Sequence, residues 1–309
     1  MTRPTRQKRD FLRITDLSRA ELVDLLERAA EWKLLGQSGP RPLAGKTLGL
    51  VFEKASTRTR VSFAVASHQL GAGEMMLSPR DMQLGRGEPI RDTARVLARY
   101  LDALVVRTFE HAKLEEMARW ADVPVVNALT DSSHPCQLLA DLLTVAERFG
   151  QDRLARGEIT VAFVGDGNNV ANSWVEAAVV LGFPLRIACP AGYDPDPELV
   201  RRAGDRVRVL RSPTEAVRGA QVVNTDVWAS MGQEAEAEER RRVFRGYILD
   251  RALMARAEPD AIVLHCLPAH RGEEIEEEVL EGPQSAVFDE AENRLHAQKA
   301  LLEFLLVPR

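Results

Sequence analysis

The sequence predicts an α/β protein made of two doubly wound parallel-sheet domains joined by a helix, and three observations support this. Short apolar, β-prone runs alternate with segments of helical periodicity along the 309-residue chain. A polar, glycine-flanked segment at 150–158 lacks apolar periodicity and divides this alternation into two series. With 45% hydrophobic and 28% charged residues, the composition is that of a soluble globular protein. The length suits two domains of about 150 residues each.

The first series, residues 1–149, opens with a helix and continues as strand–helix units. The opening helix is expected from Asp16 to about Leu35, with Ser18 and Glu21 as its capping box. Strands are predicted at 46–53, 74–78, 103–107 and 124–128, and helices at 59–70, 90–100, 111–121 and 134–149. Gly71 provides the C-terminal stop of the second helix.

The second series, residues 150–289, repeats this rhythm. Strands are predicted at 159–166, 184–190, 206–210, 221–226 and 261–266, and helices at 170–181, 197–203 and 214–218. A final amphipathic segment at 295–307 predicts a C-terminal helix that packs back across the domain junction. The acidic runs at 234–240 and 272–278 are interpreted as solvated helical faces.

Composition also excludes several partners. The formal charge is 41 − 46 = −5, which argues against nucleic acid, because binding a polyanion needs a positive face. The three cysteines, Cys136, Cys189 and Cys266, form no CxxC pair, so a disulfide framework is not indicated and a reducing cytoplasm is expected. The most apolar windows, 177–183 and 300–307, are too short to span a membrane.

Polar motifs follow the predicted strands at their carboxyl ends, where parallel sheets bind ligands. STRTR, at 56–60, follows a strand and begins a helix. Its hydroxyls, free helix N–H groups and guanidinium groups are what a phosphate dianion requires. Alternatively, Ser56 only caps the helix and the arginines lie in solvent. Arg107 ends an apolar strand, so it indicates a ligand or a buried acidic partner at the same edge.

Two further motifs suggest groups that bind a substrate. In HPCQ, His134 could donate to a carbonyl oxygen and Gln137 could bind an amide, although a histidine at a helix start is often only a cap. Asp226 ends a strand and could pair with a substrate ammonium, while the segment 225–234 could close as a lid. The alternative is a surface loop under which Trp228 packs.

Two cofactor hypotheses are weaker. GDGNN at 165–169 invites a dinucleotide-binding interpretation, but Val170 stands where the G-x-G-x-x-G fingerprint needs its third glycine. His134, Cys136, His265 and Cys266 have the chemistry of zinc ligands. We expect no metal, because adjacent residues of a continuing strand point to opposite faces.

Seven motifs together carry a resemblance that none carries alone. They are STRTR, DMQLGRGE, VVRTF, HPCQ, DVWASMGQE, HCLP and FDEAENR, in this order. From about Phe11 to the C-terminus, the chain resembles the aspartate/ornithine carbamoyltransferase family. STRTR, VVRTF and HPCQ are typical of the whole family, whereas the SMG segment with HCLP is typical of its ornithine branch.

The resemblance implies transfer of the carbamoyl group of carbamoyl phosphate to the δ-amino group of L-ornithine, giving L-citrulline and phosphate. This reaction serves arginine biosynthesis or, in reverse, arginine catabolism. Residues 1–149 would bind carbamoyl phosphate and residues 150–289 ornithine, with a C-terminal helix at 290–309 packing back on the first domain. The resemblance implies no cofactor and no metal, and it implies a homotrimer or a multiple of trimers.

The resemblance also assigns residues to the site. The catalytic residues would be Arg107, His134, Gln137 and Cys266. Carbamoyl phosphate would be bound by Ser56, Thr57, Arg58, Thr59, Gln83, Arg107, His134, Pro135, Cys136, Gln137, Cys266, Leu267 and Arg294. Ornithine would be bound by Asn169, Asp226, Ser230 and Met231. Asp226 is expected to hold the α-ammonium, because at the reacting amine it would oppose deprotonation.

Three other functions remain open from the sequence. Enzymes acting on putrescine or N-acetylornithine are similar over much of the chain, although the intact SMG segment favours ornithine. The GDGNN motif keeps a nicotinamide-dependent oxidoreductase open, and the two-lobed architecture keeps a non-enzymatic binding module for an amino acid or phosphate open.

Overall fold

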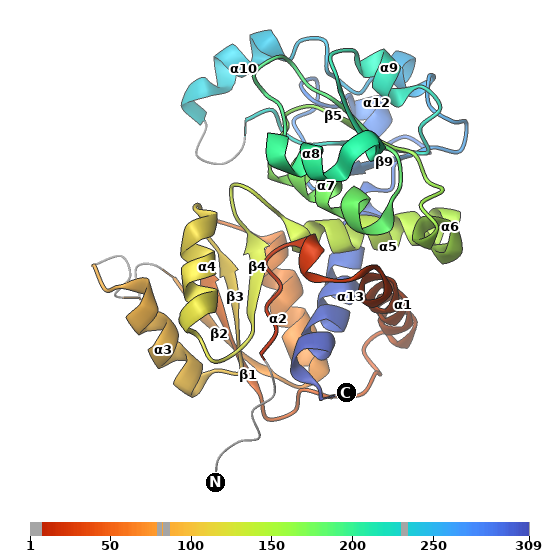
Figure 1. The fold of residues 1–309 in the computed structure, drawn as a ribbon. Helices are drawn as coiled ribbons and strands as arrows, with labels where there is room; N and C mark the ends of the chain where they lie inside the picture. Colours follow the sequence, from red (N-terminus) through yellow and green to blue (C-terminus); the bar gives the residue numbers. More distant parts are fainter. Residues whose placement is uncertain (1–7, 79–81, 83–86, 230–233, 309) are drawn as a thin grey trace.

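Two parallel sheets, each flanked by helices, form the two lobes of the molecule (Figure 1). The computed structural model describes residues 8–78, 82, 87–229 and 234–308. A four-stranded sheet has the order β2-β1-β3-β4, and a five-stranded sheet has the order β7-β6-β5-β8-β9. Every pairing between these strands is parallel. The predicted fold class is therefore confirmed.

The first lobe contains the elements predicted for the first series, with ends that shift by at most three residues. Its strands are β1 (Thr47–Phe52), β2 (Gly73–Leu77), β3 (Ala103–Arg107) and β4 (Val125–Leu129). Its helices are α1 (Arg19–Leu35), α2 (Arg58–Leu70), α3 (Ile90–Tyr100), α4 (His111–Trp120) and α5 (Pro135–Phe149), after the short 3-10 turn η1 (Ile14–Asp16). The expected helix signals are present: Ser18 and Glu21 form the capping box of α1, and Gly71 ends α2 with a φ of 87°.

The second lobe follows the second predicted series. Its strands are β5 (Val161–Val164), β6 (Leu185–Ala188), β7 (Val207–Leu210), β8 (Val222–Thr225) and β9 (Ile262–His265). Its helices are α6 (Gln151–Ala155), α7 (Asn169–Leu181), α8 (Pro197–Ala203), α9 (Pro213–Val217), α10 (Ala237–Val243), α11 (Arg251–Met254) and α12 (Glu277–Leu280), with 3-10 turns η3 (Gly204–Arg206) and η4 (Glu234–Glu236).

Strand register places the polar motifs at one edge of each sheet. In the first sheet, Phe52 at the end of β1 pairs with Arg107 at the end of β3. In the second sheet, Thr225 at the end of β8 pairs with Val164 of β5 on one side and with His265 of β9 on the other. The segments that follow these strands therefore emerge together, which is where doubly wound sheets bind ligands.

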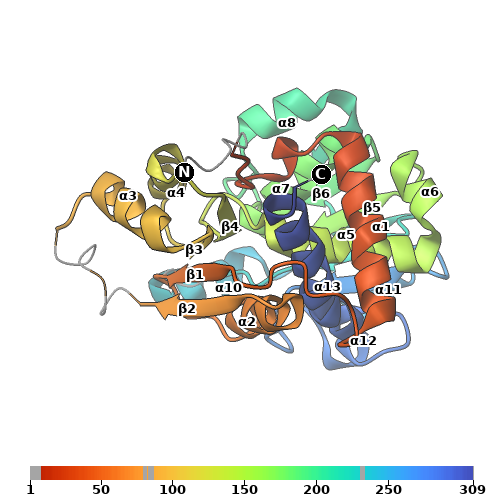
Figure 2. The ribbon, with the colours of Figure 1, turned by 90° about the horizontal axis from the view of Figure 1, so that it is seen from below.

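The C-terminal helix α13 (Val287–Leu306) returns to the first lobe, as predicted, and packs against α1, α2 and α5. Figure 2 shows it lying between α1 and α2. Its buried Lys299 donates to the carbonyl oxygen of Gly36 at 3.0 Å and to Gln69 Oε1 at 2.8 Å. The helix begins earlier than the apolar pattern predicts, because residues 287–294 contribute polar side chains that are buried near the lobe junction.

The interpretation of the two acidic runs as solvated helical faces is wrong in part. Residues 234–240 do form helical structure, but Arg240 within this run is buried. Residues 272–276 precede α12 rather than belonging to a helix, and Glu274 is fully buried because its carboxylate bonds His265. A charged run therefore contains individual residues that are buried and that bond to other buried groups.

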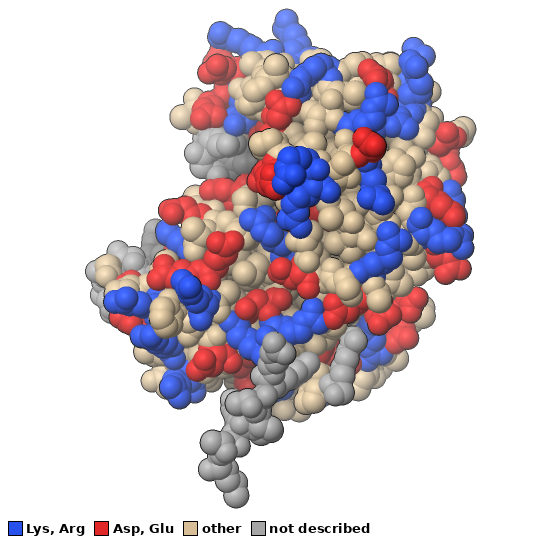
Figure 3. All heavy atoms as spheres, viewed as in Figure 1, with Lys and Arg blue, Asp and Glu red and all other residues tan. Residues whose placement is uncertain are grey.

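Charges of both signs are mixed on one face of the molecule (Figure 3). On the face shown in Figure 3, Lys and Arg side chains are interspersed with Asp and Glu side chains. Among the described residues, none of the helices combines the length and apolarity that a bilayer span requires.

Candidate active site

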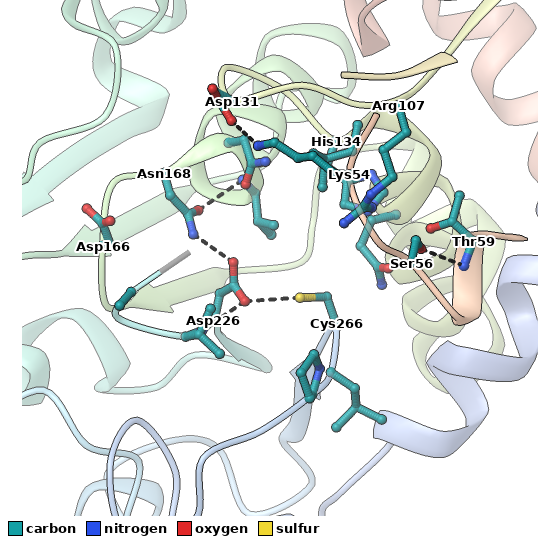
Figure 4. Close-up of a pocket in the computed structure, with 18 of the residues that line it drawn as sticks. Lys54, Ser56, Thr59, Arg107, Asp131, His134, Asp166, Asn168, Asp226 and Cys266 are labelled. Carbon is teal, nitrogen blue, oxygen red and sulfur yellow. Dashed lines mark hydrogen bonds and ion pairs between the residues drawn. The ribbon is translucent and has the colours of Figure 1, made fainter. Parts of the chain in front are cut away.

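A cavity of about 1010 Å³ lies where the carboxyl ends of the two sheets face each other. The first lobe and α13 contribute a wall of cationic and hydroxyl side chains, and the second lobe contributes a wall with carboxylate and amide groups (Figure 4). The lining includes Lys54, Ser56, Thr57, Arg58, Thr59, Arg107, Asp131, His134, Gln137, Asp166, Asn168, Asn169, Tyr193, Asp226, Arg240, Cys266, Leu267, His270 and Arg294.

The start of α2 supplies the hydroxyl groups of the cationic wall. Thr57 is its N-cap residue and makes no side-chain capping bond, while Ser56 Oγ accepts from the backbone N–H of Thr59 at 3.3 Å. Ser56 therefore bonds the helix terminus and also lines the cavity. Arg58 donates to the carbonyl oxygen of Leu267 and so reaches across to the HCLP segment of the second lobe.

Arg107 and Arg294 are buried cations that lack full sets of partners. Arg107 ends β3 and is 6% exposed, and Arg294 lies on α13 and is 3% exposed. The Nε atom of each has no hydrogen-bond partner among the described residues. Burial, together with the charges of Arg294 and Arg58, lowers the pKa of Arg107 to about 10, so it stays protonated at neutral pH. Buried like charges without a paired acid favour binding of an anion.

His134 precedes α5 and is neutral at physiological pH. Burial and the charges of Arg294, Arg107 and Arg58 hold its pKa well below the ordinary value. Its backbone N–H donates to Ser173 Oγ at 2.8 Å, and that hydroxyl donates to the carbonyl oxygen of Asn169 at 2.8 Å. Its Nδ1 is buried without a partner among the described residues. The α7 terminus of the second lobe therefore helps to place the imidazole of the first.

The opposite wall is built around Asp226, which directly follows β8. Its Oδ2 accepts from Asn168 Nδ2 at 2.6 Å, and its Oδ1 accepts from the backbone N–H of Val227 at 2.8 Å and from Cys266 Sγ at 3.0 Å. The chain Asn168–Asp226–Cys266 is visible in Figure 4. Asn169, predicted beside it, donates its amide to the carbonyl oxygen of Thr130 at 2.7 Å.

Asp166 adds a second carboxyl group to this wall. It accepts from Arg240 Nη1 at 2.7 Å, and the same nitrogen donates to the carbonyl oxygen of Trp228 at 2.7 Å. Burial raises the pKa of Asp166 to about 6 even though Arg240 acts in the opposite direction. Trp228 is 5% exposed and stacks on Phe244.

The turn after β9 brings His265 and Cys266 to the same side, so the geometric argument against a metal is wrong. Leu267 has a φ of 55°, and one ligand atom each from Asp226, His265 and Cys266 lies within 4.8 Å of the others. Both ring nitrogens of His265 are nevertheless engaged: Nδ1 accepts from the backbone N–H of Leu267 at 2.9 Å, and Nε2 bonds Glu274 Oε1 at 3.1 Å. Burial and Asp226 raise the pKa of the Cys266 thiol well above its usual value, so it is protonated.

The structure brings most of the predicted site residues together and leaves some apart. Pro135 and Cys136 do not line the cavity, and Cys136 Sγ instead donates to the carbonyl oxygen of Asn127 at 3.2 Å. Gln83, Ser230 and Met231 lie outside the described residues. Lining residues that the sequence reasoning did not assign to the site include Lys54, Asp131, Asp166, Asn168, Tyr193, Arg240 and His270.

The glycine motif after β5 has a packing explanation. A side chain at Gly167 would lie 2.2 Å from the backbone nitrogen of Pro195 and 2.6 Å from the carbonyl oxygen of Tyr193. The 193–195 backbone therefore occupies the space beside this glycine. Close approach of a protein loop, and not of a pyrophosphate, explains why glycine is needed there.

Comparisons with known proteins all match the chain to one family. The family model for the carbamoyl-P binding domain of aspartate/ornithine carbamoyltransferase matches residues 9–147, and the model for the Asp/Orn binding domain matches 157–305. The chain is 55% identical over 304 residues to the ornithine carbamoyltransferase of Methanoculleus marisnigri, covering 97% of each chain. It is 56% identical over 300 residues to the anabolic ornithine carbamoyltransferase of Pseudomonas aeruginosa, covering 96% of this chain and 97% of that protein.

A solved structure gives the same result for the fold. The ornithine carbamoyltransferase of Pyrococcus furiosus superposes with a TM-score of 0.91 at 47% identity, covering 96% of this chain and 97% of that one.

Proposed function

Because the chain belongs to the aspartate/ornithine carbamoyltransferase family, we propose that it transfers the carbamoyl group of carbamoyl phosphate to the δ-amino group of L-ornithine, giving L-citrulline and phosphate. The relatives named above are ornithine carbamoyltransferases over nearly their whole length, and this does not favour putrescine or N-acetylornithine as the acceptor.

One observation carries the proposal. The buried residues Arg107 and Arg294 line the same cavity as the carboxylate of Asp226. Each arginine has a guanidinium nitrogen without a hydrogen-bond partner among the described residues. A phosphate dianion supplies what the arginines lack, and an amino-acid ammonium suits the carboxylate. A site for one anionic and one cationic substrate is what this transfer requires.

The carbamoyl phosphate half is proposed to form at the start of α2 and the end of β3. The phosphate would contact the hydroxyl, backbone N–H and guanidinium groups of Ser56, Thr57, Arg58, Thr59 and Arg107, with Gln83 assigned by family resemblance. His134, Gln137 and Arg294 would contact the carbamoyl group, near Cys266 and Leu267. The HPCQ assignment includes Pro135 and Cys136, which would act through the backbone of α5 because neither side chain reaches the cavity.

The ornithine half is proposed to form around Asp226 and the start of α7. Asp226 would hold the α-ammonium, with Asn169, Ser230 and Met231 completing the amino-acid site. Holding the charged end there leaves the δ-amino group to extend toward the arginines. Their positive charge favours the neutral form of this amine, which is the form able to attack the carbonyl carbon.

The cavity residues would then stabilise the tetrahedral intermediate. Attack places negative charge on the former carbonyl oxygen, where donors such as Arg107 and the neutral imidazole of His134 are already oriented. Collapse breaks the bond between the carbamoyl carbon and the phosphate oxygen, the attacking nitrogen gives up a proton to the departing phosphate, and hydrogen phosphate leaves into the pocket formed by the arginines. No step in this sequence needs a cofactor.

The test is product formation by the purified protein from carbamoyl phosphate and ornithine. We expect citrulline and phosphate in equal amounts, above the rate of spontaneous carbamoyl phosphate breakdown. Phosphate release without citrulline would contradict the transfer, and binding of ornithine without any turnover would favour a binding module.

We further propose a homotrimer, or a multiple of trimers, in the cytoplasm. Supporting an assembly, the edge strand β2 exposes Met75 (52%) and the adjacent helix α2 exposes Val61 (56%), so this side of the first lobe presents apolar surface. Supporting a reducing compartment, all three cysteines are free. Light scattering should give a mass of three times 34.3 kDa or a multiple of it, and a mass of 34.3 kDa would contradict the assembly.

A further inference from the structure

Two carboxyl groups meet behind Gln137, and neither of them lines the cavity. Asp141 lies one turn further along α5, and Glu290 lies on α13, and both are almost fully buried (0% and 1% exposed). Gln137 Nε2 donates to Asp141 Oδ1 at 2.8 Å and to Glu290 Oε1 at 2.6 Å. Both hydrogens of one amide nitrogen therefore bond the acid pair.

These contacts leave only one orientation for the Gln137 amide. Its Oε1 accepts from Arg294 Nη1 at 2.6 Å, and Arg294 Nη2 donates to Thr59 Oγ1 at 3.1 Å. A guanidinium group can only donate, and one oxygen of each carboxyl group accepts from Nε2, so turning the amide over would break three bonds. Because Gln137 lines the cavity with both N–H groups engaged, it can offer a substrate only its carbonyl oxygen.

The acid pair also holds the turn that carries Cys266. Glu290 Oε2 accepts from the backbone N–H of His265 at 2.8 Å, at the end of β9. One carboxyl group therefore contacts Gln137 from the first lobe and the HCLP segment of the second lobe. Since Cys266 and Leu267 follow directly and line the cavity, this group connects both sides of the proposed reaction centre.

Two buried carboxylates at one nitrogen cannot both be ionised without a large cost. Burial raises the pKa of Asp141 to about 7, and burial together with the charge of Asp141 raises the pKa of Glu290 well above its usual range. Asp141 Oδ2 is a buried atom without a hydrogen-bond partner among the described residues. A proton on Glu290 that is donated to this oxygen would satisfy both groups.

We infer that Asp141 and Glu290 share one proton and act as positioning residues, holding Gln137 as a hydrogen-bond acceptor for the NH₂ of the carbamoyl group. The inference rests on the proposed function for the identity of that group. It assigns the acid pair no contact with either substrate, and it predicts that the pattern of donors and acceptors, not the charge at position 141, is what matters.

The kinetic test compares Asp141→Asn with Asp141→Ala. In D141N, the introduced amide would accept from Gln137 through its oxygen and donate to Glu290 through its nitrogen, so it reproduces the shared proton. We expect kcat to fall less than about fivefold in D141N and about 50-fold or more in D141A, where a buried amide hydrogen loses its partner. The KM for carbamoyl phosphate should rise in D141A while that for ornithine stays within about twofold.

The matched control is Asp289→Asn, because Asp289 precedes Glu290 on α13 but pairs with Arg148 at the surface. Its kinetics should equal those of the wild type. Equal losses in D141N and D141A, or a loss of about 50-fold in D141N alone, would overturn the inference, as would a rise in KM confined to ornithine. If D141A does not fold, D141N alone tests the inference: a fall in kcat of less than about fivefold supports it, and a fall of about 50-fold overturns it.

An infrared difference spectrum tests the proton without relying on turnover. At neutral pH, wild type minus D141N should show the carbonyl stretch of a protonated carboxyl group, which E290Q should also remove. Absence of this band would overturn proton sharing even in an active enzyme. If the band is present but no citrulline forms, the acid pair stands and the proposed function fails, so the two failures are distinguishable.

Discussion

The two walls of the cavity differ both in charge and in how their charged groups are held. On the wall of the first lobe and α13, Arg107 and Arg294 are buried with guanidinium atoms that lack partners among the described residues. On the wall of the second lobe, Asp226 and Asp166 each have close donors, from Asn168 and Arg240. The first wall therefore gains bonds when an anion enters, whereas the second is already satisfied.

This difference indicates what each wall contributes to substrate binding and to catalysis. Unpaired buried cations favour an anion strongly and also favour the charge that develops during transfer. A carboxylate that already accepts hydrogen bonds gains less free energy when a ligand binds. It therefore selects its ligand mainly by the sign of the ligand's charge and by the position of that charge. We therefore expect substitutions on the cationic wall to reduce turnover most, and substitutions on the acidic wall to alter ornithine affinity or stability.

The largest effect is expected from Arg107→Ala. It removes the donor that we propose for both the phosphate and the developing oxyanion, so kcat/KM should fall by about 10³-fold. Folding should be retained, because the substitution also relieves the repulsion from Arg58 and Arg294. Steady-state kinetics and thermal unfolding check this, with Arg119→Ala, an exposed residue of α4, as the control. Turnover near that of the wild type would remove Arg107 from the mechanism.

Arg240→Ala tests whether the acidic wall depends on its internal ion pair. The substitution leaves Asp166 buried without its cation and the carbonyl oxygen of Trp228 without its donor. The free energy of unfolding should fall by about 3 kcal/mol. Arg241→Ala is the matched control, since its partner Glu273 lies at the surface and its loss should cost less than about 1 kcal/mol. Adding Asp166→Asn should restore part of the stability, and equal losses in R240A and R241A would contradict this account.

Asp226→Asn tests the assignment of substrates to the two walls. An asparagine oxygen can still accept from Asn168, but the negative charge that would attract an ammonium is gone. The KM for ornithine should rise by about 30-fold, while that for carbamoyl phosphate stays within about twofold. Asp205→Asn, at an exposed position before β7, is the control. A rise in the KM for carbamoyl phosphate instead would reverse the assignment.

The smallest effect concerns the neutral state of His134. Its pKa is held well below the ordinary value in the folded protein, so the unfolded chain binds the extra proton first as the pH falls. Relative to His134→Gln, the wild type should therefore lose about 1.4 kcal/mol of stability for each pH unit below the unfolded histidine pKa of about 6.5. Urea unfolding at pH 7, 6 and 5 measures this, with the exposed His68→Gln as the control. Parallel curves for wild type and H134Q would show that His134 is not held neutral.

Much of the fold and one wall of the site could be predicted because local patterns determine them. Strand runs and helix caps set the ends of elements such as α1 and α2, and the parallel register then brings Ser56 and Arg107 to one edge. The cationic wall consists mainly of residues that directly follow strands, which is a signal present in the sequence itself.

The other wall was harder to predict because distant residues complete it. Asn168 belonged to a motif that the sequence suggested for another ligand, and Arg240 lay within a charged run typical of a solvated face. Tyr193 carries no local signal, and reaches the cavity only because its loop packs against Gly167. The turn at Leu267 likewise reversed an expectation based on a continuing strand.

The most direct test of the central claim is the acceptor preference of the purified enzyme at saturating carbamoyl phosphate. The account predicts that kcat/KM for ornithine exceeds that for N-acetylornithine and aspartate by about 100-fold or more, since N-acetylornithine has no free α-ammonium for Asp226 and aspartate has no δ-amine for the carbamoyl group. Putrescine carries both amines and lacks only the α-carboxylate, so it tests whether that carboxylate is also recognised. An equal or higher value for N-acetylornithine or aspartate would contradict the assignment of the acidic wall to the ammonium of ornithine, and an equal or higher value for putrescine would contradict ornithine as the preferred acceptor.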